Sequence, residues 1–394
     1  MRILAITFFL FSLFSLSAQD VKVLTDKEIV VGAKRMDKYL PLLQGKNVAV
    51  IANVTSQINS THLVDTLLKL KVKIKKIFSP EHGFRGKADA GEKVGNQTDS
   101  KTGLPIISLY GKHKKPTKED LAGIDIVIYD MQDVGVRFYT YISTMTYCME
   151  ACAENNKQFI VLDRPNPNGF FIDGPVLDMK WKSFLGLHPV PLVYGMTCGE
   201  YAQMVNGEGW LAGGKKCNLT VVQLLNYDHT VSYQLPIKPS PNLPNMTAVY
   251  LYPSLGLFEG TIMSVGRGTE YPFQMIGHPD LKDGRMNFTP KSTEGAKTPK
   301  YEGKVCYGYD LKVFGEEVVR VSRQVYVYWI IGTYNSLKDP NYFDENFNFH
   351  AGNDILQKQI KEGKTEEEIR KSWQPDIAGF KPIRKKYLLY KDFE

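Results

Sequence analysis

The chain has 394 residues, of which 43% are hydrophobic and 23% charged, and its formal net charge is +7. This is the composition of an ordinary folded protein, so it excludes a disordered chain and a membrane channel. The length allows two domains. The mild positive charge is weak evidence for nucleic-acid binding, which no recognised motif supports, so no nucleic-acid partner is expected.

The first 18 residues have the pattern of a secretory signal peptide. Met1-Arg2 gives a positive start, residues 3–14 are apolar, and residues 15–18 form a small-residue exit. We therefore expect cleavage after Ala18. The apolar run is too short to cross a bilayer, which needs about 20 residues. The sequence predicts an exported protein, periplasmic or secreted, without a membrane span, and attraction to anionic cell-wall polymer fits its charge.

Helical and strand patterns alternate from residue 29 to residue 163. Helices are expected at residues 29–40, ending before Pro41, and at 61–70 and 141–155; buried strands are expected at 46–52, 72–78, 104–110, 124–130 and 158–163. This alternation is typical of a mostly parallel sheet with helices on both faces, an α/β fold. Five cysteines do not suggest a disulfide framework in a chain this long, so buried thiols are expected.

The sequence pattern changes near Pro236. Prolines become frequent there, and the helical and strand segments that follow are shorter. We expect a signal peptide at 1–18, a first domain at 19–238 and a smaller α+β domain at 239–394. Within the second domain, residues 325–333 have a strand pattern. Residues 365–373 begin like a capped helix, because Thr365 and Glu368 have capping-box spacing.

Polar residues follow four of the predicted strands, at residues 53–56, 79–92, 130–137 and 163–169. In parallel sheets, ligands bind beyond the carboxyl ends of the strands. One polar exit could arise by chance, but four together favour a functional site.

The loop at 79–92 contains more titratable side chains than any of the other three loops. A glutamate at position 81, beside apolar Phe78 and Phe84, could have the raised pKa that a general acid needs. Glu92 supplies a second carboxylate, and Arg85 could hold a carboxylate of the protein or of a substrate. Paired carboxylates are typical of glycoside hydrolysis, at about 5 Å for retention and about 6.5–9.5 Å for inversion of configuration. The alternative is a solvated loop with a structural salt bridge.

Residues after the other predicted strands also have structural explanations that involve no substrate. Asp133 could cap the following helix, Asp163 and Arg164 could form a local ion pair, and Asn166 lies in a turn signature. Arg267, between two glycines, could reach an anionic ligand or lie at a domain interface. Potential metal ligands also occur, but without a zinc motif; they are His62, Glu81, His82, Asp130, Asp133 and Asp163.

Two enzyme classes lack their motifs. No G-x-S-x-G sequence supports a serine hydrolase of the nucleophile-elbow type. No G-x-G-x-x-G sequence follows the first strand, so no nucleotide cofactor is expected.

Several motifs, in this order, resemble the NamZ/YbbC family of exo-β-N-acetylmuramidases, formerly a domain of unknown function. They are Ser-Pro-Glu-His-Gly-Phe-Arg-Gly (79–86), Ala-Gly-Glu (90–92), Asp-Met-Gln-Asp-Val-Gly-Val-Arg-Phe-Tyr-Thr-Tyr (130–141), Asp-Arg-Pro-Asn-Pro-Asn-Gly (163–169) and Gly-Arg-Gly-Thr (266–269). The resemblance implies a Rossmann-like domain joined to a smaller carboxyl-terminal domain, with the active cleft between them. It implies release of N-acetylmuramic acid (MurNAc) from the non-reducing end of peptidoglycan fragments such as MurNAc–GlcNAc.

On this basis we expect Glu81 to be the general acid, with Glu92 the alternative or the second carboxylate. From loop position we also predict a substrate-binding set, whose arginines suit the lactyl carboxylate of MurNAc: His82, Arg85, Asp130, Gln132, Asp133, Arg137, Tyr139, Asp163, Arg164, Asn166 and Arg267. Two alternatives stay open, a non-catalytic muropeptide-binding protein and a metal-dependent hydrolase.

Overall fold

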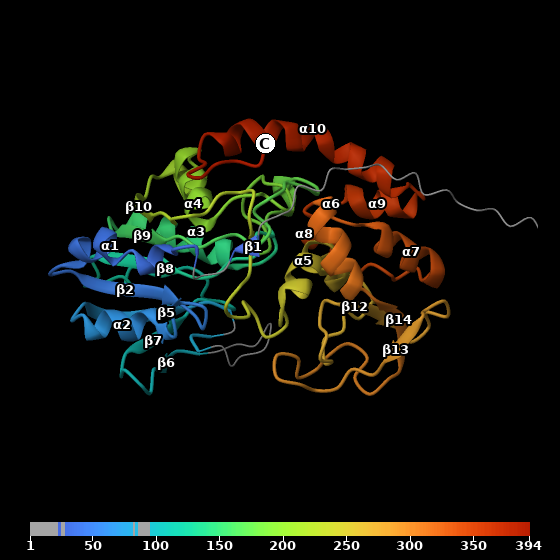
Figure 1. The fold of residues 1–394 in the computed structure, drawn as a ribbon, viewed down its shortest axis with the longest axis horizontal. Helices are drawn as coiled ribbons and strands as arrows, with labels where there is room; N and C mark the ends of the chain where they lie inside the picture. The colour runs from blue at the N-terminus through green and yellow to red at the C-terminus, as the bar shows by residue number, and fades with distance from the viewer. Residues whose placement is uncertain (1–22, 25–27, 82, 86–94) are drawn as a thin grey trace, which may run out of the picture.

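A seven-stranded sheet forms the centre of the first domain. The computed structural model describes residues 23–24, 28–81, 83–85 and 95–394. The sheet order is β10-β9-β8-β2-β5-β7-β6, and all neighbours are parallel except the edge pair β6–β7 (Figure 1). Its strands are β2 (Asn47–Ala52), β5 (Lys73–Ser79), β6 (Gln97–Thr98), β7 (Pro105–Ser108), β8 (Ile126–Asp130), β9 (Gln158–Leu162) and β10 (Asn218–Val222).

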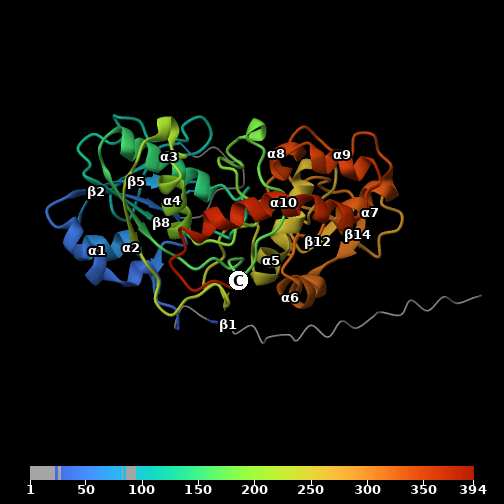
Figure 2. The same ribbon diagram turned by 90° about the horizontal axis from the view of Figure 1, so that it is seen from above.

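The central strands are apolar on both faces because helices cover both faces. Every residue of β8 is buried, and only the first residue of β2 is not. The covering helices are α1 (Met36–Leu43), α2 (Leu63–Lys69), α3 (Tyr141–Glu154) and α4 (Cys198–Gly207). Helix α3 packs against α4 on one face, and α1 and α2 lie on the other (Figure 2). This is the α/β architecture that the alternating pattern predicts, and its α/β class is confirmed.

The chain order reverses at β2, which lies between β5 and β8 in the sheet. From β2 the chain adds β5 and β7 on one side, and then β8, β9 and β10 on the other. A crevice forms at such a switch point, outside the carboxyl ends of the strands. The four predicted polar exits all follow strands of this sheet, so they meet at one edge.

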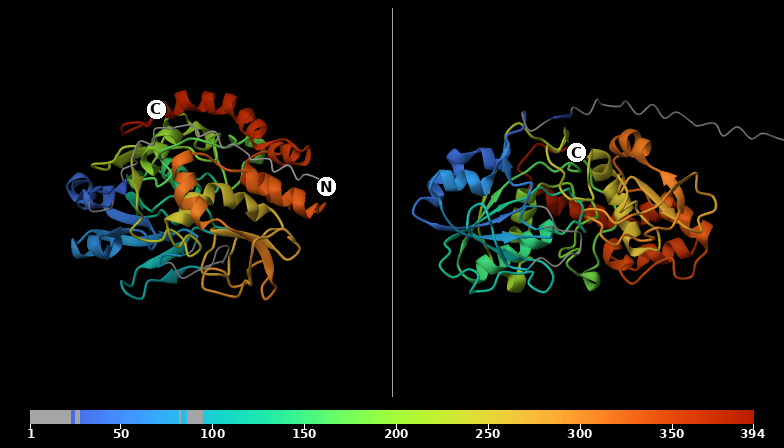
Figure 3. Two further views of the ribbon diagram at one scale, coloured as in Figure 1. Left: turned by 45° about the vertical axis from the view of Figure 1, so that its right-hand side comes forward. Right: turned by 90° about the horizontal axis from the view of Figure 1, so that it is seen from below.

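The second domain packs a small antiparallel sheet against helices (Figure 3). Its strands, in the order β12-β14-β13, are β12 (Met275–His278), β13 (Met286–Phe288) and β14 (Cys306–Asp310). Its helices are α5 (Met246–Leu255), α6 (Arg320–Ser322), α7 (Tyr328–Leu337), α8 (Phe347–Ala351), α9 (Ile355–Lys361) and α10 (Glu366–Lys385). The expected boundary between residues 238 and 239 stays a prediction.

Short elements complete the structure. Two small strand pairs are β1 (Val23–Leu24) with β11 (Ser232–Tyr233), and β3 (Gln57–Ile58) with β4 (Thr61–His62). The 3-10 helices are η1 (Gly32–Lys34), η2 (Met179–Trp181), η3 (Ala212–Gly214) and η4 (Gly256–Gly260), and η5 (Phe314–Val319) is a π-helix.

Helix α10 crosses from the second domain back to the first (Figure 1). Beyond it, the Tyr390 hydroxyl donates to the Asp163 carboxylate over 2.6 Å, and the amide of His229 donates to the Lys391 carbonyl. The carboxyl terminus therefore packs on the first domain and ties the two domains together.

Two predicted elements differ from the structure. The predicted strand at residues 325–333 is wrong, because this segment leads into helix α7. A side chain from a distant helix caps α7: the Glu366 carboxylate accepts from the amides of Val327 and Tyr328. The predicted helix at 29–40 is also displaced. Helix α1 begins at Met36 and continues past Pro41 to Leu43, whose side chain is buried in the core.

Two other expectations are confirmed, the capping box of α10 and the buried thiols. Thr365 and Glu368 form the capping box of α10, and both of its reciprocal hydrogen bonds are present. All five cysteines are free and buried. Among the helices that the structure describes, none has the length and apolar character needed to cross a membrane.

Candidate active site

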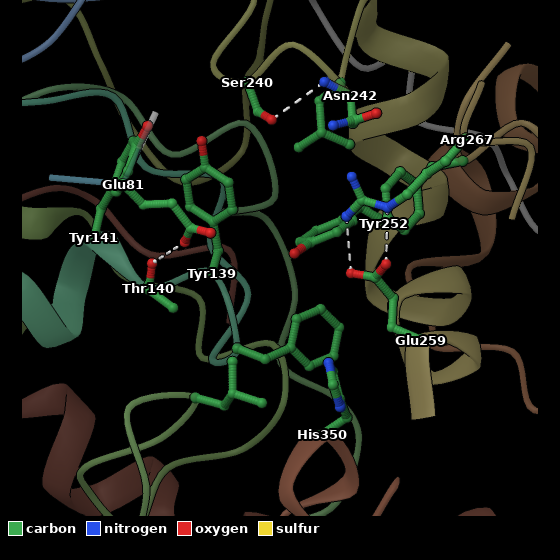
Figure 4. A pocket seen from close by; sticks show the side chains of 14 residues that line it. Glu81, Tyr139, Thr140, Tyr141, Ser240, Asn242, Tyr252, Glu259, Arg267 and His350 are labelled. Carbon is green, nitrogen blue, oxygen red and sulfur yellow. Dashed lines mark hydrogen bonds and ion pairs between the residues drawn. The ribbon is translucent and has the colours of Figure 1, made fainter. Parts of the chain in front are cut away.

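A cavity of about 120 Å³ lies between the two domains (Figure 4). The strand-exit loops of the first domain form one wall, and α5, η4 and α8 of the second domain contribute the other. Its lining residues are Glu81, Phe138, Tyr139, Thr140, Tyr141, Leu185, Ser240, Asn242, Leu243, Tyr252, Glu259, Arg267, Phe273 and His350. A cleft between domains is the position that the family resemblance implies.

Glu81 belongs to the first-domain wall. It follows β5 by two residues, and the parallel pairing of β5 with β2 and β7 brings it to the carboxyl edge of the sheet. Its carboxylate accepts a hydrogen bond from the Thr140 hydroxyl over 3.1 Å. Thr140 is the N-cap residue of α3, yet its side chain caps no helix amide. An N-cap hydroxyl normally accepts a hydrogen bond from an amide of the first helical turn, whereas this one donates to Glu81.

A second hydroxyl group lies beside Glu81. Burial raises the pKa of Tyr110, and the charge of Glu81 together with a hydrogen bond to its carboxylate raises it further. The position of Glu81 is therefore set by two neighbours, and its carboxylate faces the cavity (Figure 4).

Aromatic rings form much of the cavity surface. Tyr139 and Tyr141 meet edge to face at 4.6 Å, and Tyr252 contacts Phe138 at 5.2 Å and Phe273 at 5.0 Å. The Tyr139 hydroxyl donates to the Pro239 carbonyl over 2.8 Å, which fixes the ring against the connection between the domains. Such rings offer apolar surface for the face of a sugar.

An ion pair forms the opposite wall. Arg267 donates from Nε and Nη2 to the two oxygens of Glu259, at 2.9 and 3.0 Å, and its guanidinium lies 5.0 Å from the Phe273 ring centre. Burial alone would raise the pKa of Glu259, but the charge and hydrogen bonds of Arg267 lower it below the usual value. Glu259 was not predicted. Its signal is a single charge in the apolar run at residues 255–263.

His350 is another cavity residue that sequence reasoning missed. It lies near the end of α8, and its Nδ1 is 3.0 Å from the Asn346 carbonyl. Since a carbonyl only accepts, Nδ1 carries the proton in the neutral ring and Nε2 is left as an acceptor. Its ring lies 5.6 Å from that of Phe138. No sequence motif surrounds it.

Of the thirteen predicted site residues, the cavity brings together Glu81, Tyr139 and Arg267. His82 and Glu92 lie outside the described residues. The remaining eight lie beside the cavity or away from it, and their predicted roles in binding stay predictions. The structure shows which groups of the protein these eight residues contact.

Buried polar contacts of four of these residues connect the loops that follow β8 and β9. Asp130 receives two hydrogen bonds from Arg164, at 2.6 and 3.0 Å, and both side chains are almost fully buried. Gln132 donates to the Pro165 carbonyl, and Asn166 donates to the Met196 carbonyl. These contacts link neighbouring strand exits into one buried platform.

Two buried aspartates complete the platform. Asp133 accepts from the amide of Gly135 and from the Tyr194 hydroxyl, and burial raises its pKa to about 6. Asp163 accepts from Thr197 and from Tyr390, and burial likewise raises its pKa to about 6. Both carboxyl groups are held by donors of the protein itself.

Arg137 and Arg85 are also engaged outside the cavity. Arg137 donates to four carbonyl oxygens, those of Pro175, Val190, His350 and Ala351, at 2.6 to 3.1 Å. Arg85 pairs with Asp99 at 2.9 and 2.7 Å, and its guanidinium lies over the Phe84 ring, 4.8 Å from the ring centre. The alternative of a structural salt bridge therefore describes the contacts that Arg85 makes.

The described residues include no group of three or more His, Cys, Asp or Glu side chains arranged to hold a metal ion. Among the candidate ligands, His62 uses its ring nitrogens locally, one near the Asn53 carbonyl and one accepting from the amide of Val64. His82, another candidate, lies outside the described residues.

Comparisons with known proteins agree along almost the whole chain. The family descriptions "Exo-beta-N-acetylmuramidase NamZ, N-terminal" and "NamZ, C-terminal" match residues 48–247 and 250–390. The peptidoglycan beta-N-acetylmuramidase NamZ of Bacillus subtilis (strain 168) is 40% identical over 379 residues, which cover 89% of each chain. Two solved structures of DUF1343 family proteins from Bacteroides fragilis, 46% and 32% identical, match with TM-scores of 0.86 and 0.77. Each covers 92% of this chain and 99% of its own. The chain belongs to the exo-β-N-acetylmuramidase NamZ family.

Proposed function

We propose that this glycosidase releases MurNAc from the non-reducing end of peptidoglycan fragments such as MurNAc–GlcNAc, with Glu81 as the general acid. The observation that carries the proposal is the position of the Glu81 carboxylate, which faces an aromatic cavity between the domains. The substrate class follows from the family and from the Bacillus subtilis relative, which is a peptidoglycan beta-N-acetylmuramidase.

In this mechanism Glu81 gives its proton to the bridging oxygen as the glycosidic bond breaks, and GlcNAc leaves as the alcohol. Water then supplies the oxygen at the anomeric carbon of MurNAc, and the proton that it loses goes to a carboxylate, to Glu81 in a retaining path or to the second carboxylate in an inverting one. The other carboxylate of the cavity, Glu259, suits the acid role less well. Both of its oxygens accept from Arg267, which stabilises the ionised form. Glu92 stays the alternative acid or the second carboxylate.

The test replaces Glu81 by glutamine, which keeps the size of the side chain and removes its acidity. With MurNAc–GlcNAc, whose leaving alcohol must be protonated, Glu81→Gln should lower kcat by about 100- to 10,000-fold, the usual contribution of general acid–base catalysis. Glu294→Gln, at an exposed position of the second domain, is the matched control. Near-native turnover of the Glu81 variant would exclude it as the acid.

A second measurement separates hydrolysis from binding. The wild-type protein is incubated with MurNAc–GlcNAc and with a GlcNAc-terminated fragment, and released sugar is detected by mass. An exo-muramidase releases free MurNAc from the first only, whereas a non-catalytic wall-binding protein binds and releases nothing. Loss of activity in EDTA with rescue by a divalent ion would favour the metal-dependent alternative.

We also propose that the protein is exported, on the strength of the signal-peptide pattern at residues 1–18. Expression of the full chain with fractionation should give a mature protein that begins near Gln19 in the periplasm or the medium. An unprocessed chain found only in the cytoplasm would contradict this.

A further inference from the structure

The structure separates the four arginines of the predicted substrate-binding set. Arg85 pairs with Asp99, Arg164 pairs with Asp130, and Arg137 donates to backbone carbonyls. Arg267 is the one of the four that lines the cavity. The guanidinium groups of the other three are committed elsewhere in the protein.

The contacts of Arg267 leave one edge of its guanidinium open. Nε and Nη2 donate to Glu259. Among the residues that the structure describes, Nη1 has no hydrogen-bond partner. Figure 4 shows Nη1 on the side of the guanidinium that faces away from Glu259, toward the cavity. Glu259 thus fixes the plane of the group and points its remaining donors at the space a ligand would fill.

A second cation lies close to the ion pair. Lys300 donates from Nζ to the carbonyl oxygens of Glu259 and Thr261. Its charge and that of Arg267 both lower the pKa of Glu259, while the carboxylates of Asp344 and Glu259 both act on Lys300. The attraction of this wall for an anion therefore rests on the open donor edge of Arg267.

We propose that Arg267, oriented by Glu259, binds the lactyl carboxylate of MurNAc and so selects MurNAc over GlcNAc. This inference rests on the proposed function, because it takes MurNAc as the ligand. The lactyl carboxylate is the group that distinguishes the two sugars, and a planar guanidinium edge suits a carboxylate. Glu81, the proposed general acid, lies on the other wall and offers an anion no cationic partner, so an anionic group is directed to the Arg267 side of the cavity.

The test measures binding of three neutral or anionic sugars by calorimetry: MurNAc, its lactyl amide and GlcNAc. The wild-type protein should bind MurNAc about 30-fold more tightly than the amide, since hydrogen bonds to charged groups have that order of strength. Arg267→Gln should bind MurNAc and the amide equally. Arg285→Gln, at an exposed position of the same domain, should keep the wild-type preference. An Arg267→Gln protein that keeps the full preference for MurNAc would overturn the proposal.

Glu259→Gln tests the positioning role of the carboxylate. With its partner neutral, Arg267 loses its fixed orientation, so KM for a β-MurNAc substrate should rise about 10-fold while kcat changes little. A fall in kcat with KM unchanged would contradict a role in ground-state recognition. Thermal melting of each variant shows whether it is folded before its binding is interpreted.

The outcome also distinguishes this inference from the proposed function. A wild-type protein that prefers MurNAc to its amide but hydrolyses no β-MurNAc bond would refute hydrolysis and keep the carboxylate site. A protein that hydrolyses β-MurNAc bonds and binds acid and amide equally would refute the carboxylate site alone.

Discussion

Replacement of Arg137 by leucine should destabilise the protein by about 4 kcal/mol and also weaken substrate binding. The Arg137 side chain is 0% exposed. It forms no ion pair among the described residues, and burial lowers its pKa to about 9, so it stays protonated near neutral pH. Two of its carbonyl partners belong to the first domain, and two belong to the end of α8. One buried side chain therefore bonds both domains.

The magnitude follows from these four hydrogen bonds. Each bond from a charged donor contributes about 1.5–3 kcal/mol, but burial of the cation itself costs several kcal/mol. Loss of the donors costs about 1–3 kcal/mol for each buried carbonyl oxygen that is left unsatisfied. Set against the relieved cost of burying the cation, the net loss is about 4 kcal/mol. Arg137→Lys keeps the charge but cannot reach four carbonyls with three donors, so it should recover only part of the loss.

The assay combines denaturant unfolding with steady-state kinetics on a β-MurNAc substrate. Because Arg137 holds the backbone of His350, whose ring lines the cavity, Arg137→Leu should raise KM under conditions where the variant is folded. Gly352→Ala is an independent perturbation. Gly352 has φ +79°, and an added Cβ would lie 2.3 Å from Nη2 of Arg137. Unfolding of Arg137→Leu within 1 kcal/mol of wild type would refute the reasoning.

Two further predictions concern stability. Burial raises the pKa of Asp133 from 3.8 in the reference state to about 6. Between pH 6 and pH 3.8 this carboxyl group is protonated in the folded state but ionised in the unfolded state. The free energy of unfolding therefore rises as the pH falls through 6, by up to about 3 kcal/mol near pH 4. Asp133→Asn should remove this part of the pH dependence, and melting curves from pH 8 to pH 5 would show it; an unchanged slope would argue against it. Thr365→Ala removes the cap of α10 and should cost about 1 kcal/mol in denaturant unfolding. A loss near zero would mean that packing alone fixes this helix.

Much of the first domain can be predicted because its signals are local. Strands β2, β5, β8 and β9 are apolar runs between helical patterns, and each lies within two residues of its predicted range. Their alternation with helices implies parallel pairing, and parallel pairing places the polar exits at one edge. The capping box of α10 is also a local signal.

The rest depends on contacts between distant residues. Helix α7 begins where Glu366 accepts its free amides, and nothing in the sequence near residue 328 indicates that cap. The cavity adds Glu259 and His350 to Glu81 across the domain boundary. Polar residues at strand exits also look alike in sequence, whether they bind one another, as Asp130 and Arg164 do, or face the cavity.

The arrangement suggests why so many polar residues of the motifs face away from the cavity. A general acid works only if it is held in place, and Glu81 lies two residues beyond the end of β5. Buried contacts such as Asp130–Arg164 fix the loops beside it, and Arg137 fixes α8 against them. Glu81 and Arg267 come from different domains, so the domains must keep one relative position for both to meet one sugar. The residues of these motifs are therefore explained by a requirement for rigidity as much as by contact with substrate.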